Sequence, residues 1–244
     1  MRPVRRGHSP QAGPFDPYST AKVPLLIRLG LYCSYCERRV ITNLAIEHLQ
    51  PKGVAAFAHL ENEWTNFLLA CVNCNSTKGD TPVDITHVLL PDRDNTFLAF
   101  EYTVDGEVRV HPGLTGQLAA QAQALLALTG LDKDLYEVQD ENGKQIVVDR
   151  VSKRMESMGI ALDQAAAIAA DPGNLALRTS TAKMAFLDGA FSVWMTAFAG
   201  DPDMQQRLID IFPGTRLSGC FGSSGHIAVS PHPNDDGLSP GGRI

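Results

Sequence analysis

The stretch that decides the fold is residues 43–53, NLAIEHLQPKG, in which a glutamate and a histidine stand side by side after an apolar run that resembles a strand. Two stretches flank it, LYCSYCERR at residues 31–39 and NFLLACVNCNSTKGD at residues 66–80. Each contains a Cys-x2-Cys pair, which we call the first and the second knuckle. The predicted order is knuckle, strand, polar loop, strand, knuckle and short helix. If one ion holds both knuckles, Glu47 and His48 come close to Asn75, which follows the last cysteine.

The cysteine spacing predicts a structural zinc site. Two tight pairs can present four thiolates to one ion, and soft thiolates suit a closed tetrahedral zinc site with Zn–S distances of about 2.3 Å. Four buried structural cysteines or a redox pair are the alternative, which two matching pairs disfavour. With no position left open for water the site is structural, and folding of this part should depend on metal. The predicted ligands are Cys33, Cys36, Cys71 and Cys74.

In these residues the sequence resembles the zinc-bearing branch of the HNH endonucleases, which implies a ββα-metal fold over about residues 30–82. The matching elements are the Glu-His pair with Pro51 (EHLQP), Asn66 in WTNFLLAC and Asn75 in CNSTKG. More loosely, the helical C-terminal extension and the phrases LPDRDNT and FPGT resemble the small HNH nucleases of bacterial anti-phage operons of the Septu or retron type, which often stand beside an ATPase.

The resemblance implies a role for each matching residue. His48 would be the general base, and Glu47 and Asn75 would hold one Mg²⁺ or Mn²⁺ ion through oxygen atoms. Asn66 would fix the loop that aims the histidine. The family more often has Asp at the position of Glu47 and His at the position of Asn75, and the amide favours a hard cation. Asn73 is an alternative ligand to Asn75.

Nucleic-acid contacts are predicted from basic residues. Lys78, one helical turn after Asn75, and Arg38 and Arg39, after the first knuckle, are either phosphate contacts or solvated surface residues. The net charge of -6 and pI of 5.6 argue against a protein that coats nucleic acid, but residues 1–45 carry seven Lys or Arg and two acids. Residues 91–244 carry twelve Lys or Arg and twenty acids, so a polyanion should prefer the N-terminal third.

The sequence predicts an α+β chain with four parts. A flexible basic arm at 1–20 precedes the HNH module at 21–90, a hairpin with a helical domain at 91–212, and an irregular tail at 213–244. The hairpin turns at Asp105-Gly106, and a helix follows that ends at Gly130. Further helices are expected along the stripe Val147, Val151, Met155, Met158 and Leu162, at 180–200, which is closed at Gly200, and at 201–212, where Asp201 is the cap.

Two functions fit these patterns. The first is a metal-dependent nuclease that cuts DNA, and the second is a catalytically silent zinc module that serves as a binding platform. Glu47, His48 and Asn75 favour the nuclease, because a zinc knuckle needs none of them. The acidic C-terminal region predicts a protein interface, for self-association or for an ATPase. No apolar run is long enough for a membrane span, and a cytoplasmic location is expected, where Cys220 stands as a lone thiol.

Overall fold

The chain folds into small sheets surrounded by helices, as the predicted α+β class requires. In this computed structural model, residues 1–133 and 150–244 are described with their side chains, and residues 137–139 and 145–147 by backbone alone. Within these ranges there are three two-stranded antiparallel sheets and eight α-helices. Across the described part of the chain, no helix combines the length and the apolar character that a membrane span requires.

The N-terminal third has the predicted order of strand, loop, strand and short helix. Strand β1 pairs antiparallel with β2, and His48 lies opposite Phe67. The 18 residues between them carry two 3-10 helices and no strand. The elements are η1 (Tyr18–Ala21), α1 (Lys22–Leu29), β1 (Ala45–His48), η2 (Ala55–Leu60), η3 (Trp64–Asn66), β2 (Phe67–Ala70) and α2 (Val72–Lys78).

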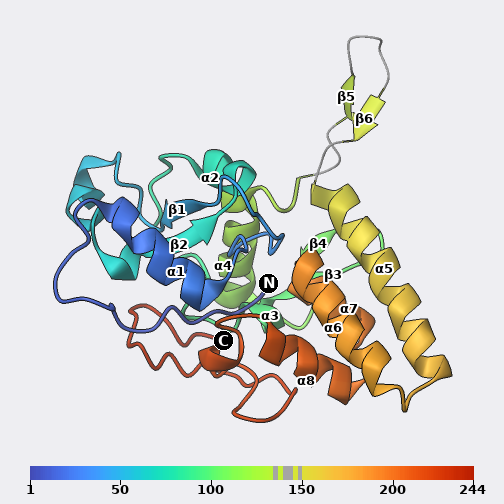
Figure 1. The fold of residues 1–244 in the computed structure, drawn as a ribbon. Helices are drawn as coiled ribbons and strands as arrows, with labels where there is room; N and C mark the ends of the chain where they lie inside the picture. Colours follow the sequence, from blue (N-terminus) through green and yellow to red (C-terminus); the bar gives the residue numbers. More distant parts are fainter. Residues whose placement is uncertain (134–136, 140–144, 148–149) are drawn as a thin grey trace.

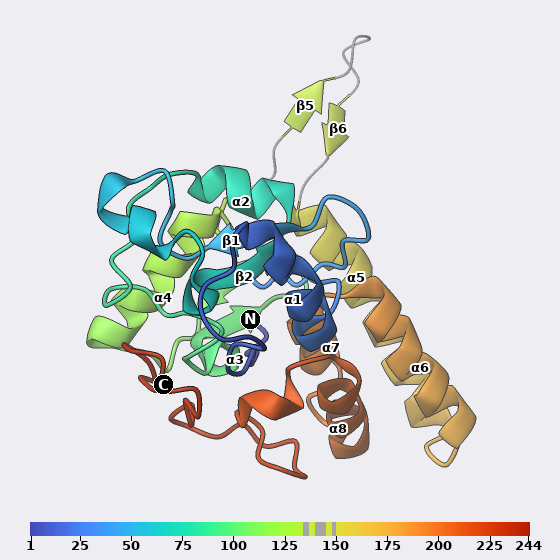
Figure 2. The ribbon, with the colours of Figure 1, turned by 60° about the vertical axis from the view of Figure 1, so that its left-hand side comes forward.

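The rest of the chain is a hairpin followed by helices. The predicted hairpin is confirmed, with Gly106 in its turn at φ +75°, and the next helix ends at Gly130 as predicted. In Figure 1, α5 to α8 lie on one side of the N-terminus, and β1, β2, α2 and α4 lie on the other; Figure 2 again shows α5 to α8 grouped together. The elements are α3 (Thr96–Ala99), β3 (Phe100–Tyr102), β4 (Val108–Val110), α4 (Gly116–Thr129), β5 (Glu137–Gln139), β6 (Gln145–Val147), α5 (Arg150–Ala170), α6 (Leu175–Asp188), α7 (Phe191–Ala197), α8 (Pro202–Ile211) and η4 (Arg216–Ser218).

The predicted apolar stripe from Val147 to Leu162 is wrong in two respects: where the helix starts and which of its faces is buried. Val147 belongs to strand β6, and α5 begins at Arg150. Val151 and Met158 are buried, but Met155 and Leu162 are 45% and 44% exposed. The buried face is completed by Arg154, Ser157 and Ala161, which are polar or small and therefore invisible to a search for apolar periodicity.

The predicted helix over residues 180–200 is two helices. Helix α6 begins earlier, because Asn174 accepts a hydrogen bond from the backbone N–H of Leu177 at 2.9 Å. It ends at Gly189, whose φ of +89° breaks the helix, and α7 starts two residues later. Gly189 forms a β-bridge with Arg38, beside the first knuckle. A contact with the N-terminal third therefore interrupts the helix. Helix α8 has the predicted cap, since Asp201 accepts from the N–H of Met204.

The predicted flexible arm is packed at its beginning. Met1, Arg2, Val4 and Arg6 are buried, and the Arg6 guanidinium contacts Asp92 at 2.7 Å. Arg2 and Arg6 are buried, and the partly exposed Arg5 is paired with Asp235 and Asp236, so these arginines are already occupied by contacts within the chain. The tail from residue 213 is irregular apart from η4, as predicted, but it is also packed, because Cys220, Phe221 and His232 are buried.

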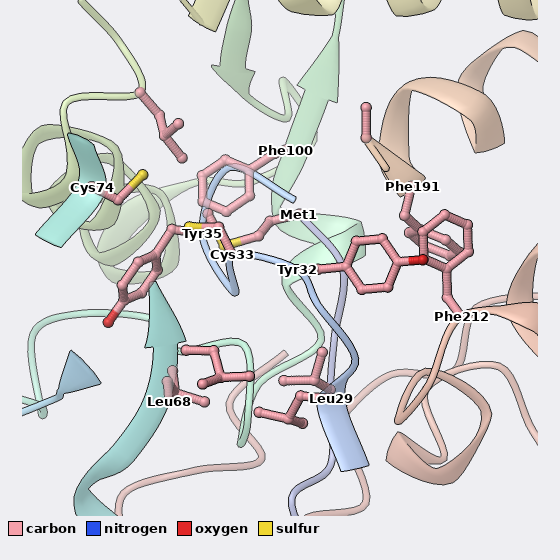
Figure 3. Close-up of a cluster of buried hydrophobic side chains, with 14 of the residues drawn as sticks. Met1, Leu29, Tyr32, Cys33, Tyr35, Leu68, Cys74, Phe100, Phe191 and Phe212 are labelled. Carbon is pink, nitrogen blue, oxygen red and sulfur yellow. The ribbon is translucent and has the colours of Figure 1, made fainter. Parts of the chain in front are cut away.

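One buried cluster connects the N-terminal third with the C-terminal helices. Figure 3 shows Cys33 and Met1 near its centre, with Cys74 and Tyr35 on one side and Tyr32, Phe191 and Phe212 on the other. Tyr32 lies between the two regions and contacts the ring of Phe212 with a centroid distance of 5.1 Å. The first knuckle and the helical region therefore share buried apolar surface.

Candidate functional site

The four predicted zinc ligands converge. Their Sγ atoms all lie within 4.8 Å of one another, and those of Cys36 and Cys71 are 3.7 Å apart. A tetrahedron with Zn–S bonds of 2.3 Å has edges of about 3.8 Å, so the cluster has the size that zinc requires. All four cysteines are free of disulfides. The residues present therefore fit one structural zinc ion.

Basic side chains surround the cysteine cluster. The Arg150 Nη1 atom is 3.3 Å from Cys74 Sγ. Burial alone would lower the pKa of Arg38, but the nearby sulfur atoms of Cys71 and Cys36 outweigh it and raise that pKa. Arg38 therefore faces the zinc ligands, where guanidinium groups offset the negative charge of bound thiolates. The guanidinium of Arg39 lies over the ring of Phe186, 5.9 Å from its centroid. Neither arginine lines the cleft described next.

A cleft of about 370 Å³ opens beside β1 and α2. It brings together Glu47, His48, Asn75 and Lys78 from the predicted site residues. Asn73, the alternative metal ligand, is exposed and does not line the cleft. The two asparagines are two positions apart on a helix and so face different directions, which favours Asn75. The full lining is Tyr18, Ala45, Ile46, Glu47, His48, Pro51, Lys52, Asn75, Ser76, Lys78, Gly79 and Asp80.

The imidazole of His48 is held in one tautomer. Its Nε2 atom is 2.8 Å from the backbone carbonyl oxygen of Glu61. Because a carbonyl oxygen only accepts, Nε2 carries the hydrogen and Nδ1 is the acceptor. Tyr18 and Phe67 pack edge-on against the ring, with centroid distances of 4.8 and 5.3 Å. Burial lowers the pKa of His48, so the ring is neutral at pH 7 and can take a proton.

Asn66 connects the two ends of the loop between β1 and β2. Its Oδ1 accepts from the N–H of Gln50 at 2.8 Å, and its Nδ2 donates to the carbonyl oxygens of Gln50 and Leu60 at 3.0 and 3.2 Å. Glu61, the partner of His48, is the next residue after Leu60. This geometry suits the loop-fixing role that the resemblance implies, since Asn66 positions the carbonyl that orients the imidazole.

Glu47 and Lys78 form a buried ion pair. The Nζ atom of Lys78 is 2.9 Å from Glu47 Oε1 and donates to the backbone carbonyl of His48 at 2.8 Å. Each side chain is 2% exposed. Burial raises the pKa of Glu47, and Lys78 opposes that rise. Lys78 is therefore a buried partner of Glu47 and His48 and not the exposed side chain that we considered from the sequence.

Three cleft residues escaped sequence reasoning. Tyr18 comes from the segment expected to be flexible, and the Nζ atom of Lys52 lies over its ring, 4.2 Å from the centroid. Lys52 also pairs with Glu61 at 2.9 Å. Asp80 lies at the rim, after α2. Of these three, only Lys52 and Asp80 could have been suspected from the sequence, because each lies within two residues of a position that was singled out there.

Comparison with known families decides what this arrangement is. The model of the family described as HNH endonuclease matches residues 33–81. Residues 33–81 are an HNH endonuclease domain. The HNH domain contains all four cysteines, both strands and the three charged or polar residues of the predicted centre. The resemblance seen in the sequence is confirmed at this level. No curated protein sequence matches the chain.

The HNH domain also implies a catalytic divalent ion, and the cleft has donors that suit one. Glu47 provides a carboxylate and Asn75 an amide oxygen, and hard cations prefer such ligands. Among the described residues, every polar contact of the Glu47 side chain uses Oε1. Oε2 is therefore available as a ligand for an ion. The donor set fits the implied group.

Proposed function

We propose that this protein is a metal-dependent endonuclease that hydrolyses phosphodiester bonds of DNA, with His48 as the general base and with Glu47 and Asn75 as ligands of one divalent ion. The observation that carries the proposal is the orientation of His48. Its Nε2 hydrogen is committed to the Glu61 carbonyl, and the acceptor nitrogen belongs to a side chain that lines the same cleft as the two oxygen donors.

In this proposal the chain's own residues activate the attacking water and hold the base in place. His48 Nδ1 takes a proton from a water molecule in the cleft, and that water attacks the phosphorus atom. Tyr18 and Phe67 keep the ring in place, and Asn66 keeps the carbonyl in place, so that the base does not rotate away. When bound by Glu47 and Asn75, Mg²⁺ or Mn²⁺ would polarise the phosphate and stabilise the leaving oxygen.

A cleavage assay tests this proposal directly. Supercoiled plasmid is incubated with the protein and Mg²⁺ or Mn²⁺, and the intact protein is compared with His48→Ala and His59→Ala. His59 is a matched control, because it lies in the same loop between β1 and β2 but is exposed and outside the cleft. Loss of a general base lowers the rate by about 10²- to 10⁴-fold. We expect that loss for His48→Ala and a rate close to that of the intact protein for His59→Ala, with bound zinc unchanged in both.

Parallel reactions with single-stranded DNA and with RNA define the substrate. Cleavage of RNA but not of DNA would contradict the proposal that DNA is the substrate, but it would leave the proposed mechanism unchanged. If zinc is bound and the intact protein cuts no nucleic acid with either ion, the proposal fails. The second candidate, a silent zinc-module binding platform, would then account for the cysteine cluster.

The finer predictions are carried by the sequence alone. A role in anti-phage defence and docking onto an ATPase follow from the looser resemblance, and self-association follows from the acidic C-terminal region. All three stay predictions, as does the cytoplasmic location. The plasmid assay, repeated with a partner protein of that kind, is the measurement that addresses docking.

A further inference from the structure

The starting observation is the charge balance of the cleft. Its charged lining residues are Glu47 and Asp80, which are negative, and Lys52 and Lys78, which are positive. The formal charges of the lining therefore cancel, although a divalent cation binds best where ligands supply net negative charge.

Lys78 offsets the negative charge of Glu47 by direct contact. Its ammonium group is 2.9 Å from Glu47 Oε1, and both side chains are 2% exposed. Water screens a buried pair much less than an exposed one. Lys52 is 40% exposed and paired with Glu61, which is also exposed, so solvent weakens its effect on an ion in the cleft. Lys78 is thus the cation that an incoming divalent ion would experience most strongly.

Lys78 also fixes the geometry of two neighbouring residues. It donates to the carbonyl oxygen of His48 at 2.8 Å while it holds Oε1 of Glu47. Tyr35 Oη contacts the same carboxylate oxygen at 3.4 Å. These contacts fix the carboxylate from one side and connect the end of α2 to the end of β1.

We propose, building on the nuclease function above, that Lys78 is a positioning residue that neutralises Glu47, so that the divalent ion binds this cleft together with a nucleic-acid phosphate and not before it. Once Glu47 is neutralised, a phosphate oxygen of the substrate supplies the negative charge that the protein ligands lack. The cleft then becomes a complete metal site only when the substrate is in place. Metal and nucleic acid should consequently strengthen each other's binding by the same factor.

The test is Mn²⁺ binding, followed by the electron paramagnetic resonance signal of free Mn²⁺, with zinc-loaded protein. Every protein in this titration also carries His48→Ala, which prevents cleavage and leaves the phosphate oxygens of the duplex unchanged, and each is titrated alone and with the duplex. The protein with Lys78 and Lys52 intact should bind Mn²⁺ at least about tenfold more tightly with the duplex than without it. Equal affinity in the two titrations would overturn the proposal without any variant of Lys78.

Three variants assign the effect to Lys78. Lys78→Gln removes the charge but keeps a hydrogen-bond donor, and it should bind Mn²⁺ about tenfold more tightly than the intact protein in the absence of DNA. Lys78→Arg keeps the charge and should match the intact protein. Lys52→Gln removes one positive charge from the exposed side of the same cleft and should change the affinity by less than about twofold. A folded, zinc-loaded Lys78→Gln variant with unchanged or weaker Mn²⁺ binding would contradict the proposal.

The same experiments separate this inference from the function on which it rests. If the protein neither binds Mn²⁺ in any condition nor cleaves nucleic acid, the proposed function fails. If it cleaves with Mn²⁺ but its affinity for the ion is independent of DNA, only the role of Lys78 fails. The cleavage rate tests the positioning role of Lys78. Lys78→Gln should cleave more slowly than the intact protein despite its tighter metal binding, and Lys78→Arg should recover part of the rate.

Discussion

At the scale of single residues, Asp92 is an acid-sensitive contact of the fold. Burial alone would raise its pKa, but the guanidinium groups of Arg93 and Arg6 outweigh burial and hold that pKa at about 2. The carboxylate therefore stabilises the protein above its unfolded pKa of 3.8, and this contribution of about 2 kcal/mol is lost as the pH falls from 4 to 2. Urea unfolding of the intact protein across this range should show the loss.

Asp92→Asn gives the control for that loss. The variant leaves two buried guanidinium groups without their carboxylate, so it should unfold about 3 kcal/mol more easily at pH 7. Its remaining stability should depend less on pH between 4 and 2. Asp163→Asn, on the exposed side of α5, should behave as the intact protein. A stability of Asp92→Asn that equals that of the intact protein at pH 7 would show that the Arg6 contact is dispensable.

The sequence predicted which residues come together at the site but not which of their side chains contact one another. The cysteine spacing predicted the four-cysteine cluster, and the Glu-His pair predicted two residues of the cleft, because both are local patterns. The contact between Lys78 and Glu47 joins residues 31 positions apart. A lysine at the end of a short, mostly polar helix is expected to be a solvated side chain, and only the fold shows that its ammonium group contacts Glu47 and His48 of β1.

At the scale of elements, the break between α6 and α7 supplies a test of why the predicted helix over 180–200 is interrupted. Gly189 has a φ of +89°, and a Cβ atom there would lie 2.6 Å from the backbone nitrogen of Arg39. Both the left-handed backbone and the close approach exclude a side chain. Gly189→Ala should destabilise the protein by about 2 kcal/mol or more, measured by thermal or urea unfolding.

Gly159→Ala is the matched control for this prediction. Gly159 lies inside α5, and nothing is within 4 Å of the position that its Cβ would take. Alanine is the better helix former, so this variant should gain about 0.5 to 1 kcal/mol. Equal stabilities of the two variants would mean that the approach of Gly189 to the first knuckle is not tight.

Elements with local start and stop signals were predictable, and those shaped by tertiary contact were not. Helix α8 has its cap and proline in the sequence, and the β3–β4 hairpin has Asp105-Gly106. The α6–α7 break and the buried face of α5 depend on packing against Arg39 and Gly106, residues far away in the chain. Periodicity reports the apolar face of a helix but not which neighbour covers it.

At the scale of the whole molecule, Glu37 in the first knuckle joins several parts of the chain. Its carboxylate is buried and accepts hydrogen bonds from the backbone N–H of Arg2 at 2.5 Å, from the N–H and hydroxyl of Ser192 at 2.7 Å each, and from the hydroxyl of Tyr102 at 3.3 Å. One side chain beside a zinc ligand therefore connects the N-terminal segment, β3 and α7. The sequence placed the N-terminal segment and Glu37 in two separate parts and β3 and α7 together in a third, because a buried carboxylate has no local signature.

Removal of zinc should therefore unfold far more than the HNH domain. The knuckles contact the helical region through Glu37 and Ser192, through the bridge between Arg38 and Gly189, and through Arg150 beside Cys74. Without an ion the four thiolates repel one another or take up protons, and the knuckles lose their shape. We expect a strong zinc chelator to lower the far-ultraviolet circular dichroism at 222 nm by more than the domain alone can account for.

The size of that signal makes the measurement decisive, because little of the helix lies within the domain. Helix α2 has 7 residues, whereas α5 has 21 and α6 has 14. If the helical region were independent of the zinc site, chelation would leave almost all of the signal at 222 nm intact. The loss should be reversed by added Zn²⁺ and should coincide with the loss of nuclease activity. It should also be accompanied by exposure of Trp194, which is fully buried in the native fold and can be followed by its fluorescence.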